Sequence, residues 1–466
     1  MTIYYSERNP FLYQEIVLYV LPLNDKTAVP ANLYNSKPEE GHCFGSLETA
    51  LKSCRDTYHY KIIVKAGTYN ETINIEQMDL SKVHIIGEVN REEGEVIHKN
   101  GSSYNWSVSF LEPTVERLNS RFRTVFTKGI FFNKCSAPSI EDIYFNLEEN
   151  ETNPPKIQFS KCTSVHEREL HFYVNDPNPK LRDTAPCVHF FASNNILVGT
   201  LFCFSDRGTF VDTNSSVFFS QAMWLESYSD YNTAEHNYTP PQILRVDYSR
   251  LSFRAEVYST LTDVYKIIKD GRFYINSSSK VNLPFNLKLR INNESFINKP
   301  DNTLNRDRQD SYMLTLNAFS SITSSRLAEI EFIGGNRLLG VREQSTFDIY
   351  NIKLRGPYIH SGIFSLNGST IKIANETYIY DSDIKDFCVS RFNSLLIFIG
   401  DIKSTTLSSD KPLSFRALNK SEISFGPNSD ITGNGENSRL TNYVPLLNSP
   451  ANDDFSQIYK LVEVYN

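Results

Sequence analysis

Two carboxylates in the first half of the chain have the types and spacing for acid–base chemistry. Asp142 and Glu169 lie 27 residues apart, within two similar stretches, 141–145 and 168–172. If that spacing is one structural repeat, neighbouring repeats hold the two side chains about 5–9 Å apart, a separation that glycosidases use. Like charges this close raise one pKa, as an acid/base pair requires. We predict this pair as the catalytic candidate, with solvated charges at strand edges as the alternative.

An aromatic-rich segment, residues 226–241, is the second candidate site. It lengthens one repeat by about ten residues, and such insertions become loops on one face of a repeat protein, often the binding face. Aromatic rings have apolar faces that stack on sugar rings. A subunit contact is the alternative, because Tyr is also enriched in protein interfaces. The predicted glycan-binding residues are Trp224, Tyr228, Tyr231, His236 and Tyr238.

No cofactor or metal motif is recognisable in the sequence. Asp381, Asp383 and Asp386 offer carboxylate oxygens that suit Ca²⁺, but without the spacing of a known calcium loop. The seven cysteines include no CxxC pair or Cys/His cluster, so a zinc site is not expected. We predict no cofactor and no metal, and we expect reduced, buried thiols made in a reducing cytoplasm.

The elements that position these residues repeat about every 25 residues. A small polar residue precedes an alternating strand with two inward apolar positions, such as Phe347 and Ile349. Coils whose strands pair in parallel about 4.8 Å apart fit this period, whereas a propeller blade needs about 40–50 residues. We predict an all-β fold, a single-stranded right-handed parallel β-helix (a solenoid) of about 12–14 coils. Its anchors are Ser320, Ser345, Ser369, Ser394 and Ser421.

Two earlier coils align almost residue for residue at a spacing of 27. Phe-Asn-Lys-Cys at 132–135 corresponds to Phe-Ser-Lys-Cys at 159–162. Parallel pairing in a β-helix places equivalent residues of neighbouring coils above one another. The alignment predicts three stacked pairs, namely Cys135 on Cys162, Ile143 on Leu170 and Phe145 on Phe172.

The first 90 residues carry a more specific pattern. Gly-Ser-Leu-Glu-Thr-Ala-Leu-Lys-Ser-Cys at 45–54 predicts a short amphipathic helix, the segment 60–73 contains a strand followed by Ala-Gly-Thr-Tyr-Asn-Glu, and the strand at 83–87 ends in Gly. This order resembles the entry to pectin-lyase-like right-handed β-helices, a superfamily that includes pectate lyases, pectin methylesterases and the tailspike and tail proteins of phages. Ala66 stands where that family usually has Pro. The resemblance implies a fold rather than a reaction.

The motifs of the pectin enzymes are missing from the chain. Gln-Ala-Met-Trp at 221–224 is a fragment of one methylesterase signature, Asp453-Asp454 stands too late for a polygalacturonase, and Arg-Gly-Pro at 355–357 lacks the calcium-binding aspartates of a lyase. Tailspike-type proteins keep no shared motif, so the chain is closest in character to phage tailspike and tail proteins. That resemblance implies a homotrimer, with other virion proteins and host polysaccharide as partners.

The repeat divides the chain into three predicted regions. Residues 1–59 hold an N-terminal strand and a capping helix, residues 60–436 form the β-helix, and residues 437–466 form a C-terminal cap or oligomerisation tail. The open ends of a solenoid expose unpaired backbone groups and need such caps. Two insertions, near 226–241 and 298–310, interrupt the repeat, and we predict the second as a flexible surface loop.

Composition limits the partners and the location of the protein. The chain carries 47 Lys and Arg against 54 Asp and Glu, a formal net charge of −7, with both signs interspersed. A nucleic-acid-binding protein would concentrate basic residues on one face, so no nucleic-acid partner is expected. The N-terminus lacks the pattern of a signal peptide, and no window is apolar enough for membrane insertion.

These patterns lead to three functional hypotheses. We expect a virion surface or tail protein that contacts host surface glycans, is made in the host cytoplasm and has no chemistry of its own. The alternative is a polysaccharide-degrading hydrolase or lyase on the same scaffold, which would use the carboxylate pair. A bacterial surface adhesin is the third hypothesis, and it is disfavoured because no secretion or anchoring signal is visible.

Overall fold

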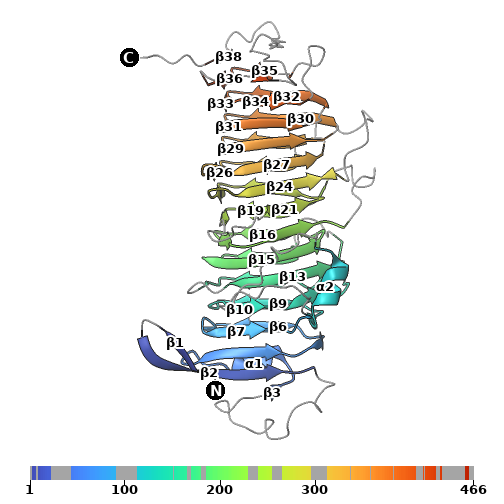
Figure 1. Cartoon of the computed structure of the whole chain (residues 1–466), viewed down its shortest axis with the longest axis vertical. Coiled ribbons are helices and arrows are strands. Elements are labelled where there is room, and N and C mark those ends of the chain that lie inside the picture. The colour runs from blue at the N-terminus through green and yellow to red at the C-terminus, as the bar shows by residue number, and fades with distance from the viewer. Residues whose placement is uncertain are drawn as a thin grey trace. The chain divides into compact units, whose positions relative to one another are not determined.

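The computed structural model of the chain is an all-β parallel β-helix, as predicted (Figure 1). The described residues contain two short helices, α1 (Leu47–Ser53) and α2 (Val115–Arg121). The chain divides into two compact units, Met1–Trp224 and Leu225–Asn466. The structure describes residues 3–6, 9–22, 43–90, 113–150, 152–164, 169–179, 185–228, 240–253, 265–294, 312–335, 337–356, 358–380, 383–405, 413, 415–426, 431–432 and 457–460.

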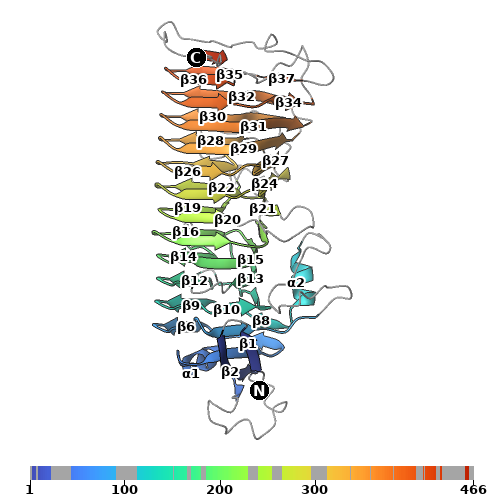
Figure 2. The ribbon, with the colours of Figure 1, turned by 60° about the vertical axis from the view of Figure 1, so that its left-hand side comes forward.

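The first unit contains two sheets of stacked parallel strands, and Figure 2 shows its second-sheet strands one above another. An antiparallel pairing of β1 with β2 starts the unit. The first sheet contains β1 (Ile3–Ser6), β2 (Asn9–Val20), β3 (Cys43–Phe44), β4 (His59–Val64), β5 (Gly67–Tyr69), β7 (Val83–Ile86), β8 (Thr124–Phe126), β10 (Ser139–Glu141), β11 (Tyr144–Asn146), β13 (Leu170–Asp176), β15 (Ile196–Ser205) and β17 (Ser216–Phe219). The second sheet contains β6 (Ile73–Glu76), β9 (Ile130–Asn133), β12 (Ile157–Ser160), β14 (Val188–Phe191) and β16 (Thr209–Asp212).

The second unit repeats the same arrangement of two sheets, and β18 (Met223–Glu226) spans the boundary between the units. Its first sheet contains β20 (Arg250–Phe253), β21 (Tyr265–Lys269), β23 (Lys280–Leu283), β24 (Lys288–Asn293), β26 (Ser321–Ser324), β27 (Glu329–Gly334), β29 (Thr346–Arg355), β31 (Thr370–Tyr380), β33 (Leu395–Phe398), β34 (Ile402–Ser404), β36 (Glu422–Phe425), β37 (Ile431–Thr432) and β38 (Gln457–Lys460). Its second sheet contains β19 (Gln242–Asp247), β22 (Arg272–Asn276), β25 (Leu314–Leu316), β28 (Arg337–Arg342), β30 (Tyr358–Leu366), β32 (Asp383–Arg391) and β35 (Phe415–Leu418).

The core of each unit is the interior of the coils, where side chains of successive strands stack. Phe132 on β9 lies opposite Phe159 on β12, and their rings stack with centroids 5.0 Å apart. In the second unit, the rings of Phe398 and Phe425 stack at 5.6 Å. Because side chains alternate between the two faces of a strand, the residues between these positions face outward. The outer faces of the sheets therefore carry the polar side chains that remain available for function.

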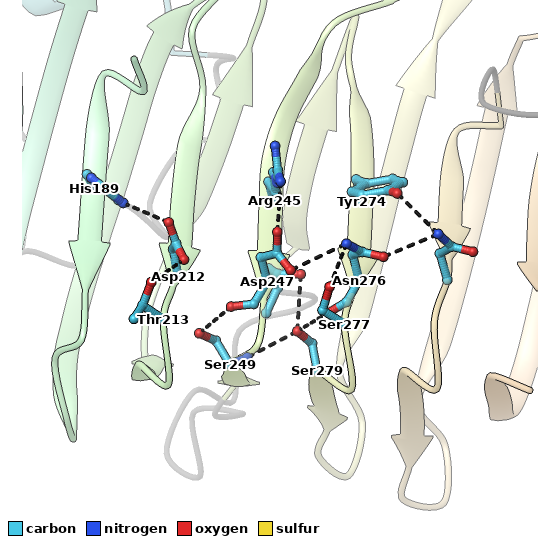
Figure 3. Close-up of polar contacts among 12 residues, drawn as sticks. His189, Asp212, Thr213, Arg245, Asp247, Ser249, Tyr274, Asn276, Ser277 and Ser279 are labelled. Carbon is cyan, nitrogen blue, oxygen red and sulfur yellow. Dashed lines mark hydrogen bonds and ion pairs between the residues drawn. The ribbon is translucent and has the colours of Figure 1, made fainter. Parts of the chain in front are cut away.

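The predicted serine anchors are confirmed, and they form a ladder at one corner of the coils. Two residues in the left-handed region, such as Asn367 (φ 56°) and Gly368 (φ 73°), turn the chain before an anchor. The Ser369 hydroxyl donates to the Leu366 carbonyl at 2.6 Å, and the Ser369 N–H donates to the Ser394 hydroxyl of the next coil at 3.2 Å. Figure 3 shows the equivalent bond between two other coils, from the Ser249 N–H to the Ser279 hydroxyl, which is 3.1 Å long. Further anchors linked in this way are Ser193 with Ser215, Ser320 with Ser345, and Ser394 with Ser421.

The predicted N-terminal helix is present as α1, which packs against β2, β3 and β6. Ser46 caps it by accepting a hydrogen bond from the Thr49 N–H at 3.3 Å, a preferred arrangement at a helix start. At the other end, β38 pairs in parallel with β36, so strand stacking continues past the predicted end of the β-helix at residue 436. The rest of the predicted C-terminal region, the loop 298–310 and most of the insertion 226–241 lie outside the described residues.

Candidate functional site

The predicted carboxylate pair does not occupy equivalent positions. Leu170 on β13 lies opposite Ile140, not Ile143, so the residue before it, Glu169, lies at the level of Ser139. Asp142 sits between β10 and β11 with φ 57° and is buried, with 5% of its surface exposed. The predicted alignment of these two residues is therefore wrong.

The predicted register is wrong because the turns before β10 and β13 differ in length. From Cys135 to Ile140 there are five positions, whereas from Cys162 to Leu170 there are eight. Part of this difference is recovered by the bulge at Asp142, because β11 pairs with β13 through Tyr144↔Tyr173 and Phe145↔Val174. The predicted pairing of Ile143 with Leu170 is wrong for the same reason. Phe145 is paired with Val174 instead of Phe172, but the rings of Phe145 and Phe172 still contact each other, with centroids 6.3 Å apart. The predicted stacking of Cys135 on Cys162 is confirmed by the pairing of β9 with β12 and by the bridge Ser136↔Thr163.

Glu169 belongs to a polar cluster on the outer face of the first unit, which we call the Glu169 cluster (Glu169, His171, Ser220 and Gln221). Its carboxylate accepts hydrogen bonds from the Ser220 hydroxyl and the Gln221 amide, both at 2.6 Å. The Nε2 atom of His171 lies 3.5 Å from the second carboxylate oxygen. The ring of His171 passes so close to Gly199 that a Cβ there would lie 2.4 Å from Cε1. The cluster therefore depends on glycine at this position.

The charge state of Glu169 argues against a role as general acid. Burial by itself would raise the pKa of this carboxyl, but the contacts from His171 and Ser220 hold it below its ordinary value. A general acid needs a raised pKa, so that the carboxyl still holds its proton near neutral pH. Serine, histidine and a carboxylate also make up hydrolytic triads, but there the histidine lies between the other two. Here Glu169 lies between Ser220 and His171, so Ser220 donates its proton to the carboxylate rather than to the imidazole.

The predicted glycan-binding residues are only partly described. Trp224 on β18 is 6% exposed, so its ring is not available as a stacking surface. Tyr228 is 45% exposed and remains a candidate. Tyr231, His236 and Tyr238 lie outside the described residues.

The side chains of the predicted acidic cluster, Asp381, Asp383 and Asp386, are not described by the structure. Asp381 lies outside the described residues, and Asp383 and Asp386 are described only as backbone positions on β32. Within the described ranges, no group of three His, Cys, Asp or Glu side chains is placed to hold a metal ion.

The structure reveals an aromatic surface that the sequence prediction missed. Tyr378 and Tyr380 on β31 stack with ring centroids 5.9 Å apart and an angle of 13° between the rings. Both side chains face outward, because Thr377 and Ile379 beside them are buried. The signal was present as Tyr-Ile-Tyr in an alternating strand, a pattern that places both tyrosines on one face of the sheet.

Charged side chains surround these tyrosines, and we call the group the tyrosine ladder (Lys353, Glu376, Tyr378, Tyr380 and Lys403). Lys353 and Lys403 lie directly opposite Tyr378 on the two neighbouring strands, β29 and β34. Their ammonium groups lie 6.0 and 5.2 Å from its ring centroid, within the range of cation–π attraction. The Glu376 carboxylate accepts hydrogen bonds from the Tyr378 hydroxyl and from Lys403.

Hydrogen bonds and neighbouring charges fix the protonation states in the tyrosine ladder, and its charged side chains remain partly accessible to solvent. Burial tends to raise the pKa of Glu376, but the hydrogen bonds from Lys403 and Tyr378 hold it below its usual value. Burial and the neighbouring Glu376 both raise the pKa of Tyr378, so its hydroxyl stays protonated. The side chains of Lys403 and Glu376 keep 39% and 26% of their surface exposed. The ladder therefore offers two parallel rings together with an ionised carboxylate and two ammonium groups.

Polar contacts also lie along the second-sheet strands within each unit (Figure 3). In the first unit, His189 contacts Asp212 at 3.4 Å. Burial lowers the pKa of His189 and outweighs the opposing effect of Asp212. In the second unit, Arg245 pairs with Asp247 at 2.7 Å, which in turn accepts from Asn276 at 3.4 Å. Within each unit these side chains are bonded to their neighbours, as expected for polar ladders that stabilise stacked strands.

Comparison with known proteins identifies no relative. The chain matches no protein-family model, no curated protein and no solved structure. No helix in the described part of the chain is long and apolar enough to cross a membrane.

Proposed function

We propose that this protein binds glycans without cleaving them, and that the tyrosine ladder of the second unit is the contact surface. The observation that carries the proposal is the pair of parallel rings of Tyr378 and Tyr380, 5.9 Å apart on an outward strand. Flat aromatic pairs present the apolar surface on which sugar rings stack. Glu376, Lys353 and Lys403 lie beside them and provide an acceptor and donors for sugar hydroxyls.

We further propose that the protein works on the surface of a virion, as a tailspike- or fibre-like component. The parallel β-helix and the resemblance of the first 90 residues to pectin-lyase-like entries support this proposal. A homotrimer that contacts other virion proteins belongs to the same proposal. Mass spectrometry of purified particles should detect the chain, and light scattering of the purified protein should give the mass of three copies; absence from the particles would overturn the virion assignment.

Glycan binding is tested with the full chain on an array of surface polysaccharides, followed by calorimetry on the best ligand. We expect the variant Y378A/Y380A to lose affinity by about tenfold or more per ring, because each ring supplies a stacking contact. Y248A is the matched control, because Tyr248 is 62% exposed in the turn between β19 and β20. Equal affinity of the double variant and the native protein, with both folded by circular dichroism, would contradict the proposal.

A polysaccharide-degrading enzyme is the second candidate function. Glu169 supports it only as a nucleophile or base, because its lowered pKa keeps the carboxylate ionised and 26% of its side-chain surface is exposed. A reducing-end assay on the polysaccharides that bind separates the two functions. Release of new reducing ends by the native chain, abolished in E169Q, would replace the binding proposal by this one.

A further inference from the structure

A group of arginines surrounds two stacked aromatic rings on the outer face of the second sheet in the second unit. Tyr312 and Phe364 stack with centroids 5.7 Å apart and 14° between their planes. The ring of Tyr312 packs directly against Gly340. A Cβ at that position would lie only 2.8 Å from the ring, so this packing requires glycine. Leu366 and Val389 complete an apolar base that faces away from the coil interior. We call this base, together with the arginines described next, the arginine patch.

Guanidinium groups lie around this base from several coils. Arg337 and Arg342 on β28 lie 5.9 and 5.8 Å from the Tyr312 ring centroid, and Arg391 on β32 lies 5.8 Å from that of Phe364. Arg416 on β35 lies opposite Val389. Four cations therefore converge on one outward side of the sheet, although the whole chain carries a net negative charge. Arg342 is buried beneath this surface, and the other three arginines are partly exposed.

We propose that the arginine patch binds the carboxylate or sulfate groups of an acidic polysaccharide. The planar guanidinium group donates pairs of parallel hydrogen bonds that match a carboxylate or sulfate, and it does so most strongly where water is partly excluded. The Nε atom of Arg391 is shielded from solvent and donates no hydrogen bond within the described part of the chain. A stacked aromatic base limits the motion of the guanidinium groups above it, which lowers the entropy lost on binding.

The shape of the patch favours an acidic glycan over a nucleic acid. Nucleic-acid-binding surfaces spread basic residues along an extended face that follows the phosphates. Here the neighbouring strand places the buried, neutral Thr315 opposite Gly340, and the neutral amide groups of Asn317 and Asn276 beyond it bond to each other at 3.2 Å. A short cationic surface bordered by neutral side chains suits a sugar chain that carries anions at intervals.

The proposed site is separate from the tyrosine ladder, which lies on the first sheet. It goes beyond the proposed function because it adds a second surface and a ligand class defined by charge. Variants of one surface leave the other unchanged, so the failure of either proposal can be recognised by itself.

Binding of heparin, hyaluronate and neutral dextran to the full chain tests the proposal by calorimetry. We expect heparin or hyaluronate to bind, dextran not to bind at this patch, and the affinity to fall as salt rises. The variant R391Q/R416Q should lose about tenfold to a hundredfold in affinity for the acidic ligand, because two charge-assisted contacts are removed. R250Q is the control, because Arg250 on β20 is exposed and lies on the first sheet.

Three outcomes would overturn the proposal. The first is the absence of binding by both acidic polysaccharides. The second is an equal loss of affinity in R391Q/R416Q and R250Q, since that result would indicate only a general effect of net charge. The third is a DNA oligonucleotide that binds the patch more tightly than either polysaccharide. Arg391 and Arg416 are both partly exposed, and circular dichroism of the double variant should match the native protein.

Discussion

The polar network around Asp176 in the first unit and the tyrosine ladder in the second unit use the same kinds of group in opposite ways. The Asp176 carboxylate is fully buried and accepts from Arg207 Nε at 2.7 Å, from the Ser205 hydroxyl at 2.6 Å and from the Asn178 amide at 2.8 Å. In the tyrosine ladder, Lys403 and Glu376 remain partly in water. A charge whose partners are all supplied by the protein stabilises the fold, whereas a solvated charge can exchange its partner for a ligand.

The Asp176 network also connects the segments between strands of neighbouring coils. Arg207 donates to the Pro155 carbonyl, and the Asn178 amide donates to the Glu148 carbonyl at 3.0 Å. The partners therefore come from three successive coils, near the ends of β11, β13 and β15 and just before the start of β12. The network ties the irregular segments between strands, where the backbone lacks the regular hydrogen bonds of a sheet.

The largest expected effect comes from breaking the buried pair. R207M should lower the free energy of unfolding by about 3–5 kcal/mol, because Asp176 would keep a buried charge without its cation. Urea unfolding followed by circular dichroism measures the change. R123M is the control, because Arg123 is exposed in the same unit. A loss below about 1 kcal/mol would show that Asp176 does not need its partner; the double variant D176N/R207M should recover part of the loss.

The serine ladder provides the next largest effect. S394A removes the acceptor of the buried Ser369 N–H and should cost about 1–3 kcal/mol, the usual price of an unsatisfied buried donor. Thermal unfolding of the variant should show a lower midpoint than that of the control S120A, whose hydroxyl is exposed and donates within α2. Equal midpoints would indicate that water or a rearranged turn replaces the lost acceptor.

The fold could be predicted because each coil repeats one local arrangement. Each anchor serine needs a turn with left-handed residues before it and an alternating strand after it, and both leave a signal in the sequence. The register between coils could not be predicted from a constant spacing, since the turns differ in length and bulges such as Asp142 absorb part of the difference. A shift of three residues, which places Leu170 opposite Ile140 instead of Ile143, separates Asp142 from Glu169 in the stack.

The candidate sites were less predictable than the fold. Glu169 was identified as a carboxylate of interest, but its partners Ser220 and Gln221 come from a position more than fifty residues later. The tyrosine ladder brings together residues of three coils, and each coil alone shows only an ordinary strand. Sequence spacing reports which residues share a face of one strand, whereas a site across coils depends on the register.

Glu169 is less buried than Asp176 and less exposed than Lys403. We expect its contribution to stability to depend on pH. Its folded pKa is below the ordinary value of 4.5, so the ionised form stabilises the protein above that pH, and this contribution is lost as the pH falls through the folded pKa. E169Q should therefore cost about 1 kcal/mol at neutral pH, where it replaces charge-assisted hydrogen bonds by neutral ones. Urea unfolding at a series of pH values below 7 should show the two proteins converge in acid. A constant difference at every pH would show that the charge of Glu169 contributes nothing.

The smallest effect on stability is expected in the tyrosine ladder. K403M should change the free energy of unfolding by less than about 0.5 kcal/mol, because the pair with Glu376 is solvated and its attraction is screened by salt. Glycan affinity should nevertheless fall, since the ammonium group beside the Tyr378 ring is lost. Unfolding and calorimetry on the same preparation separate the two quantities. K372M is the control, because Lys372 on β31 pairs with Asp348 on β29 and both side chains are exposed. If K403M costs as much stability as R207M, the ladder is a structural network like that of Asp176, and its charges are not free to exchange partners with a ligand.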